Sequence, residues 1–279
     1  MIQETHFSKK GRIKIPNFEV FEAIRSEEKG GTAIGVHSSL KPTLISEHNE
    51  NVEMVVVEVS ISNKNIRLIS GYGPQENWSE SDRLPFFQTL ENEVTKAELT
   101  GTSIIIGMDA NSKLGPNIIP QDSHSQSPNG AKLSDIIKRH NLIVVNGMKI
   151  CKGRITRTKN TKRKVEESTI DFVIVSRDLA EIVKNMIIDE ERKHVLARIT
   201  KSKQKVNIVE SDHNTILTEF TLKWNKGDGK QRFEVMNLKN KNCQEKFKII
   251  TSNGKELSSI FDDNTKDVNT AATLQHRNL

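Results

Sequence analysis

The feature that most constrains the fold is the alternation of short β-branched runs with amphipathic helical segments in residues 52–222. The runs VEMVVVEVSI and NIRLISGYG are separated by the polar break SNK, a pattern typical of a β-hairpin. SDRLPFFQTLENEVTKAEL then carries apolar residues at helical spacing. Strands joined partly as hairpins and partly through helices predict a mixed-sheet α+β (α/β) domain.

Three later apolar runs begin or end in acidic and amide residues. In TSIIIGMDAN, STIDFVIVS and SDHNTILTEF these residues are Asp109, Asn111, Asp171, Asp212 and His213. Each alone is explained by a strand-end cap or a turn, because Asp and Asn favour backbone hydrogen bonding there. Asp171 is harder to explain in this way, since an ionised carboxylate among Ile, Phe and Val needs a partner that offsets its desolvation. We expect His213 to be that partner.

The charge balance favours an acidic partner such as nucleic acid. The chain has 279 residues, a formal net charge of +6 and a pI near 9.2. The stretch KICKGRITRTKNTKRK (149–164) contains eight Lys and Arg residues and no acid. A solvated hairpin or loop is one interpretation, and contact with a phosphate backbone is the other. The candidate DNA-binding residues are Lys152, Arg154, Arg157, Lys159, Lys162 and Arg163.

Several features bear on location and domain organisation. The sequence shows no signal peptide and no apolar run of the roughly 20 residues that span a bilayer. Cys151 and Cys243 form no disulfide framework or metal-ligand pair, which is typical of a reducing compartment. We therefore expect a nuclear or cytoplasmic protein, neither secreted nor in a membrane. The Lys- and Asn-rich residues 223–279 are predicted to form a linker with a helix or two, outside a domain at 1–222.

Five segments in order resemble the endonuclease/exonuclease/phosphatase superfamily of pancreatic deoxyribonuclease and the abasic-site endonucleases. They are QETH, SGYGP, GMDAN, STIDFVIVS and SDHNTI. The sequence looks most like the endonuclease domain of non-LTR (LINE-like) retrotransposons, because GMDANSKLG, HNLIVVNG and a basic segment precede STIDFVIVS. The resemblance implies a four-layered sandwich of two mixed β-sheets flanked by helices, with the site at one edge. Residues 223–279 resemble the connector toward a reverse transcriptase.

The resemblance also implies a metal site. Glu4 matches the metal-binding glutamate of the QE motif, and Asp212 lies next to the metal. Mg²⁺ takes carboxylate oxygens and keeps several waters, so one or two carboxylates are an adequate contribution from the protein. We expect Mg²⁺, with Mn²⁺ as the alternative, and no small-molecule cofactor.

The remaining roles follow from the same resemblance. Asp109 matches the aspartate that orients or deprotonates the attacking water, and Asn111 matches the neighbour that binds the scissile phosphate. Tyr72 matches the aromatic hydroxyl near that phosphate. Asp171 and His213 match the pair that stabilises the pentacoordinate phosphorus, where negative charge grows toward the transition state.

One element of the family is not found. The superfamily normally has a strand with an asparagine before the QE motif, and here Met1 lies two residues before Gln3. We therefore expect an N-terminally truncated sandwich whose first strand is missing. Three functions remain open: a metal-dependent DNA endonuclease that nicks a target for retrotransposition, a phosphatase of the same superfamily, and a non-catalytic remnant that binds nucleic acid.

Overall fold

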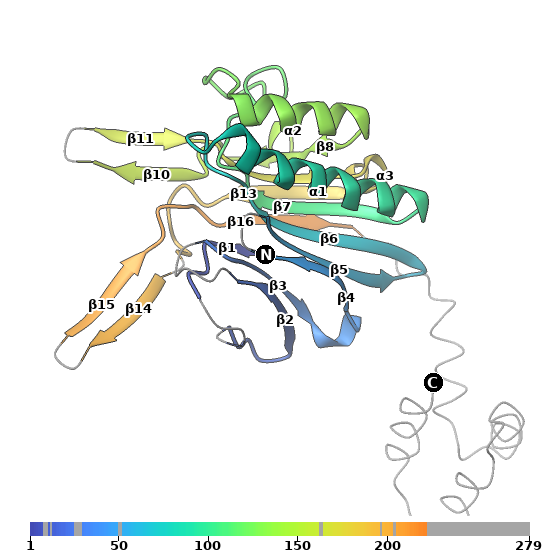
Figure 1. Ribbon diagram of the computed structural model, residues 1–279, viewed down its shortest axis with the longest axis horizontal. Helices are drawn as coiled ribbons and strands as arrows, with labels where there is room; N and C mark the ends of the chain where they lie inside the picture. Colours follow the sequence, from blue (N-terminus) through green and yellow to red (C-terminus); the bar gives the residue numbers. More distant parts are fainter. Residues whose placement is uncertain are drawn as a thin grey trace, which may run out of the picture. The chain divides into compact units, whose positions relative to one another are not determined.

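The computed structural model describes residues 1–221 except 8–10, 12, 25–29, 50–51, 162–163, 196 and 203–204. Within these residues the chain forms a six-stranded sheet, two three-stranded sheets and two separate hairpins, with few helices (Figure 1). The predicted fold class, a mixed α+β sandwich, is confirmed. No helix of this described part is long and apolar enough to cross a membrane. The predicted linker at 223–279 lies outside the described residues.

The six-stranded sheet is the centre of the fold. Its order is β4 (Thr43–His48), β5 (Glu53–Ile61), β6 (Lys64–Tyr72), β7 (Ser103–Asp109), β12 (Asp171–Val175) and β8 (Ile143–Val144). The pair β6–β7 is parallel and the other pairs are antiparallel, so the sheet is mixed. Ile61 pairs with Lys64 across a two-residue turn, Ser62–Asn63, in which both φ angles are positive. Such a turn matches the twist of paired strands, and the predicted hairpin is confirmed.

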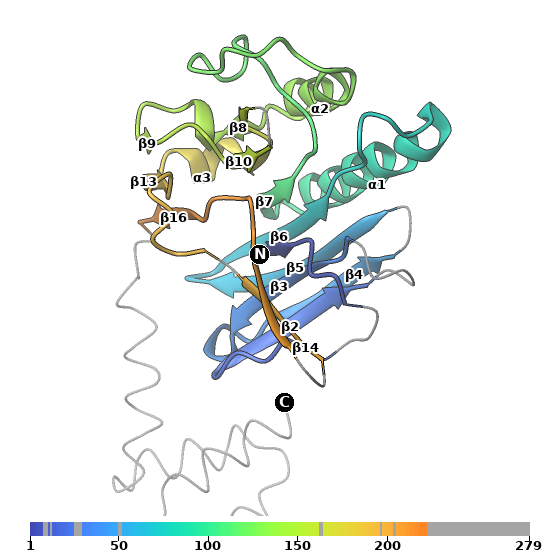
Figure 2. The ribbon, with the colours of Figure 1, turned by 90° about the vertical axis from the view of Figure 1, so that its left-hand side faces the viewer.

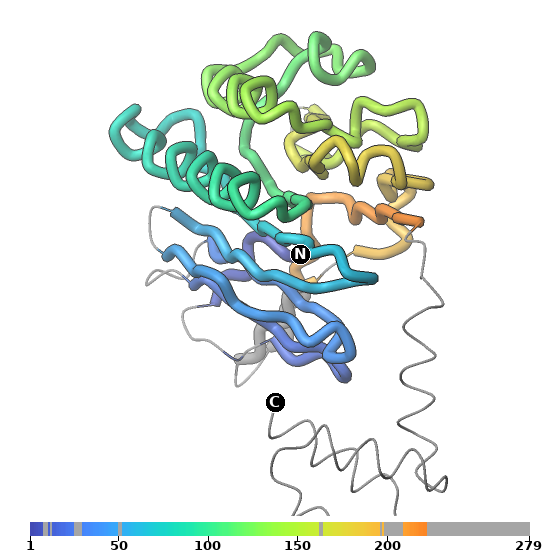
Figure 3. The backbone as a smooth tube through the Cα atoms, turned by 90° about the vertical axis from the view of Figure 1, so that its right-hand side faces the viewer, coloured from blue at the N-terminus to red at the C-terminus, as the bar shows by residue number. Residues whose placement is uncertain are grey.

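Two helices cover one face of this sheet, α1 (Glu80–Leu99) and α2 (Pro128–Arg139) (Figure 3). The side chains of Ser79 and Ser127 cap them by accepting backbone N–H bonds. The hydrophobic core has two parts, one on each face of the sheet. Met54 and Val56 of β5 pack in the part that includes residues of α1 and α2, whereas Val55 packs in the part on the opposite face, because side chains alternate along a strand.

The opposite side of the sandwich consists of two three-stranded sheets. One has the order β1 (Ile2–Gln3), β3 (Thr32–His37), β2 (Phe18–Ala23), and the short helix η1 (Ser38–Leu40) follows β3. The other has the order β16 (Ile216–Phe220), β13 (Val183–Ile188), β9 (Cys151–Lys152). The short helices η2 (Val145–Gly147) and α3 (Arg177–Ala180) lie between strands of this second half of the chain.

The two three-stranded sheets are separated by a groove. β1 pairs with β3 alone and β16 pairs with β13 alone among the described strands, so each is an edge strand. A cavity of about 940 Å³ is lined by both strands and by Gly107 and Val173 of the six-stranded sheet.

Two hairpins project from the same end of the domain (Figure 1). They are β10 (Arg157–Asn160) with β11 (Val165–Ser168), and β14 (Ala197–Ser202) with β15 (Lys205–Glu210). The first contains part of the basic stretch found in the sequence. The second has no counterpart among the predicted elements.

Candidate active site

Strand pairing places three of the predicted site residues in one row. Tyr72 on β6 is opposite Asp109 on β7, and Asp109 is opposite Asp171 on β12. Residues directly opposite on neighbouring strands point to the same face, so the three side chains lie side by side. All three are buried, with Asp109 only 1% exposed. We call Tyr72, Asp109 and Asp171 the sheet row.

His213 lies between two carboxylates of the sheet row. Its Nδ1 is 2.9 Å from Oδ1 of Asp171, as the sequence predicts, and its Nε2 is 3.8 Å from Oδ2 of Asp109. Burial opposes the charged imidazolium, but the hydrogen bond and charge of Asp171, with the charges of Asp109 and Asp212, raise the pKa of His213 to about 9. The ring is therefore a cation at neutral pH.

Asp109 has one satisfied and one unsatisfied oxygen. Its Oδ1 accepts the backbone N–H of Asn111 at 2.9 Å. Its Oδ2 is buried and has no hydrogen-bond partner among the described residues. Burial and the nearby charge of Asp171 raise the pKa of Asp109 well above its ordinary value. An unpaired buried carboxylate oxygen facing His213 is suited to a water, a proton or a cation.

Glu4 reaches the sheet row from the end of β1. Its Oε1 accepts the Tyr72 hydroxyl proton at 2.7 Å, and burial together with this carboxylate raises the pKa of Tyr72. The preceding Gln3 donates from Nε2 to Ser70 Oγ at 3.0 Å and to the Gly107 carbonyl at 3.2 Å, which holds β1 against the six-stranded sheet. Glu4 has φ 52°, a backbone conformation uncommon outside glycine and one that often occurs at functional sites.

The donor atoms fit a divalent cation. An oxygen of Glu4, an oxygen of Asp212 and a nitrogen of His213 lie within 4.8 Å of one another, and Asp109, Asp171 and His213 form a second such group. Because a protonated His213 ring has no free lone pair, the carboxylates are the candidate ligands. Carboxylate oxygens are the ligands that hard cations such as Mg²⁺ prefer. The two residues predicted for the metal, Glu4 and Asp212, therefore come together in the pocket that Asp109 and Asp171 also line.

A profile of the family described as "Endonuclease-reverse transcriptase" matches residues 66–217, which include the sheet row and His213. The chain belongs to this family. The resemblance to the endonuclease/exonuclease/phosphatase superfamily and its retrotransposon endonucleases is thereby confirmed. No curated protein matches the chain in sequence.

Solved structures share the fold of this family member at low sequence identity. The endonuclease domain of TRAS1, a telomere-specific non-LTR retrotransposon, is 18% identical with a TM-score of 0.51, over 75% of this chain and 82% of that one. An AP endonuclease from Archaeoglobus fulgidus is 16% identical with a TM-score of 0.51, over 79% and 87%. The 3' phosphatase NExo from Neisseria, bound to a product DNA hairpin, is 16% identical with a TM-score of 0.52, over 79% and 87%.

Buried polar residues that the sequence analysis missed hold the site of this endonuclease-family domain in place. Thr156 is fully buried, and its Oγ1 accepts the backbone N–H groups of Ile170 at 3.0 Å and Asp171 at 3.1 Å. Asn146 bridges the Asp171 carbonyl and the N–H of Val173 from the other side. No periodic pattern marks such residues, because each is a single polar side chain in a short irregular segment.

Asn214 continues this support on the histidine side. Its backbone N–H donates to the Thr156 carbonyl at 2.7 Å, and its Nδ2 donates to the Ile155 carbonyl at 2.8 Å. The segment that carries His213 is therefore tied directly to the segment that supports Asp171. The segment SDHN contains Asn214, but only Asp212 and His213 of this segment were predicted as site residues.

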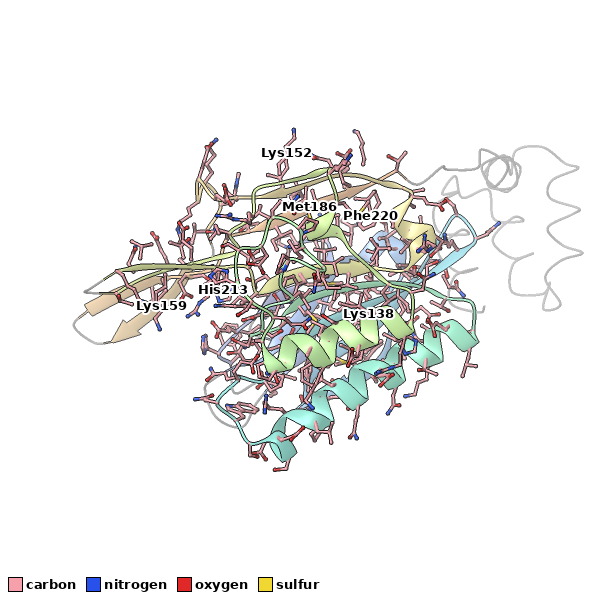
Figure 4. All side chains as sticks on the ribbon, turned by 90° about the horizontal axis from the view of Figure 1, so that it is seen from above. Lys138, Lys152, Lys159, Met186, His213 and Phe220 are labelled. Carbon is pink, nitrogen blue, oxygen red and sulfur yellow. The ribbon has the colours of Figure 1, made fainter. Side chains whose placement is uncertain are left out.

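The predicted basic residues lie in different places on the domain. Lys159 is exposed on β10, in the hairpin beside His213, whereas Lys152 lies on β9 away from it (Figure 4). Arg154 donates to the Gln121 carbonyl at 3.4 Å. Arg157 pairs with Asp212 at the mouth of the pocket. Lys162 and Arg163 are outside the described residues.

We call Glu4, Asp212 and Arg157 the rim of the site. The side chains of Arg157 and Asp212 are 31% and 35% exposed, in contrast to the buried sheet row. Figure 2 looks onto this end of the domain, with the N-terminus beside β6 and β7. His6, which sequence reasoning gave no role, also lines the pocket, and its Nε2 is 4.0 Å from Oε2 of Glu4.

Proposed function

We propose that the chain is a divalent-cation-dependent endonuclease that hydrolyses DNA phosphodiester bonds, with Mg²⁺ as the cation and Mn²⁺ as the alternative. The observation that carries the proposal is His213, held between Asp171 and Asp109 in the same pocket as Glu4 and Asp212. The superfamily hydrolyses phosphoester bonds, and this arrangement offers what such hydrolysis requires.

The residues divide the chemistry between them. A bound cation, held by Glu4 and Asp212, would neutralise phosphate oxygens and so reduce their repulsion of the nucleophile. The unpaired Oδ2 of Asp109 is placed to orient a water and accept its proton, which a raised pKa favours. The imidazolium of His213 donates toward the negative charge that grows on the phosphorus centre, and Asp171 fixes its ring.

DNA is the proposed substrate because of the family and the charges near the site. The family profile is that of endonucleases linked to reverse transcriptases, and TRAS1 and NExo are a retrotransposon endonuclease domain and a DNA-bound enzyme. Lys159 and Arg157 offer positive charge beside His213. We propose nicking of a target in the nucleus or cytoplasm, with residues 223–279 as the connector from this domain at 1–222 to a reverse transcriptase. Binding should weaken steeply as salt rises.

The proposal is tested by nicking of supercoiled plasmid by the purified full chain with Mg²⁺ and with EDTA. Wild-type protein and the control Asp135→Ala, an exposed carboxylate on α2, should nick in Mg²⁺ only, and Asp109→Ala should lose nicking by roughly 10²- to 10⁴-fold. Equal rates for Asp109→Ala and wild type would refute the site assignment.

Two further readouts separate the alternatives. Release of phosphate from a 3'-phosphorylated oligonucleotide without plasmid nicking would favour a phosphatase of the same fold. Binding of plasmid by a folded chain that neither nicks nor releases phosphate would favour a non-catalytic remnant.

A further inference from the structure

Arg157 holds one oxygen of a proposed metal ligand. Its Nε and Nη2 both lie 2.9 Å from Oδ2 of Asp212. The backbone around this pair is fixed, because the Thr158 N–H donates to the Asp212 carbonyl at 2.8 Å and Arg157 forms an isolated β-bridge with His213. The backbone of Arg157 is therefore anchored beside the site, and only its side chain is free to turn.

The same carboxylate faces the proposed cation site. Asp212 belongs to the group with Glu4 and His213, and its Oδ1 is 3.8 Å from Nε2 of His213. A guanidinium on Oδ2 neutralises much of the charge that would attract a divalent cation, and its own charge repels that cation. Without substrate, the ion pair and the cation thus compete for one carboxylate.

Arg157 is also suited to a second anion. Two of its five N–H groups point to Asp212, and the described residues supply no other partner for the rest. A planar guanidinium binds phosphate with the same two-pronged geometry that it uses for a carboxylate. Arg157 could move from Asp212 to a phosphate while a divalent cation took its place on Asp212. The guanidinium and the Asp212 carboxylate would then each keep a partner of opposite charge.

We propose that Arg157 is a shared counter-ion: it neutralises Asp212 in the free protein and turns to a DNA phosphate when substrate binds, which opens Asp212 to the divalent cation. This inference rests on the proposed function. It makes cation binding and DNA binding mutually favourable, since a coupling between two binding equilibria acts equally in both directions. If Arg157 only oriented Asp212 for the cation, removal of Arg157 would instead weaken cation binding.

The test measures Mn²⁺ affinity by the electron paramagnetic resonance signal of free Mn²⁺. The full-length chain is titrated with Mn²⁺, alone and in the presence of a short DNA duplex that has phosphorothioate linkages. The Mn²⁺ bound by the duplex itself is measured separately and subtracted. Arg157→Ala should bind Mn²⁺ about fivefold tighter than wild type without DNA, the lower end of usual coupling between sites. DNA should tighten Mn²⁺ binding about fivefold more in wild type than in Arg157→Ala, because the phosphate attracts the cation in both proteins and only wild type also frees Asp212.

Control variants distinguish a loss of folding from a direct effect of Arg157 on Mn²⁺ affinity. Arg177→Ala removes an exposed arginine that donates to Asn141, away from the site, and should bind Mn²⁺ as wild type does. Arg157→Lys keeps the charge with a single donor group and should fall between wild type and Arg157→Ala. Mn²⁺ affinity in Arg157→Ala that equals or is weaker than that of wild type, at an unchanged urea midpoint, would overturn the proposal.

A fourth variant distinguishes an error in this inference from an error in the proposed metal site. Asp212→Asn should weaken Mn²⁺ binding strongly if Asp212 is a ligand. Unchanged Mn²⁺ binding in Asp212→Asn would contradict the metal site itself. Weak binding in Asp212→Asn together with wild-type binding in Arg157→Ala would contradict the shared counter-ion alone.

Discussion

The sheet row and the rim contribute to one site but are held by different forces. The sheet row is placed by backbone pairing of β6, β7 and β12 and is buried, so its geometry is fixed by the fold. The rim depends on side-chain contacts, the Arg157–Asp212 ion pair and the hydrogen bond from Tyr72 to Glu4, and is partly exposed. We therefore expect changes behind the sheet row to reduce stability, and changes at the rim to alter ligand binding.

The largest effect is expected where the two regions meet, at His213. His213→Ala removes the cation between Asp171 and Asp109, so we expect plasmid nicking to fall by roughly 10²- to 10⁴-fold. The measurement is the initial nicking rate at saturating Mg²⁺. His194→Ala is the matched control, because His194 is exposed and pairs with Asp189 outside the pocket. If both histidine variants nick at the wild-type rate, His213 has no part in the reaction.

The second prediction tests whether the side chain of Thr156 helps strand pairing to hold the sheet row. Thr156→Val keeps the shape of the side chain but leaves the N–H groups of Ile170 and Asp171 without their acceptor. We expect a loss of about 1–3 kcal/mol in the free energy of unfolding, the usual cost of unsatisfied buried groups. Urea denaturation measures it, with the exposed Thr95→Val on α1 as the control. An unchanged unfolding free energy would show that Asp171 is placed by strand pairing alone.

The smallest effect is expected at an exposed ion pair outside both regions. Although partial burial opposes it, hydrogen bonds from Lys64, Ser103 and Ser176 lower the pKa of Asp178 to about 2. A lowered folded-state pKa stabilises the fold above the ordinary aspartate pKa, and the stabilisation is lost as pH falls from about 4 toward 2. Asp178 is 46% exposed, so we expect Asp178→Asn to cost under about 1 kcal/mol at pH 7.

Urea midpoints at pH 7 and pH 3 check the sign of this prediction. The difference between Asp178→Asn and wild type should be smaller at pH 3, because the wild-type carboxylate is then partly protonated in the unfolded chain. A difference that grows at pH 3 would contradict the assigned direction.

The sequence predicted the elements that carry the sheet row but not their register. Apolar runs ending at Asp109 and containing Asp171 identified the strands, and the demand of a buried carboxylate for a partner predicted the contact with His213. The alignment of Tyr72, Asp109 and Asp171 in one row depends on which strands pair, and no local pattern encodes that long-range choice.

The rim was less accessible to sequence reasoning. Glu4 follows a strand of two residues, too short for a periodic signal, and was assigned only through the family resemblance. Arg157 was predicted as one member of a basic stretch, and its pairing with Asp212 depends on a contact across 55 residues. Thr156 and Asn146 gave no signal, because hydrogen bonds from single buried polar residues are decided by tertiary packing.

The groove between β1 and β16 has a consequence for handling the protein at the bench. Edge strands beside an apolar groove are templates for pairing with other chains. Concentrated samples are therefore expected to form oligomers whose proportion rises with protein concentration, visible as early-eluting material in gel filtration. A solubilising fusion and low working concentrations should keep the chain monodisperse for every titration described above.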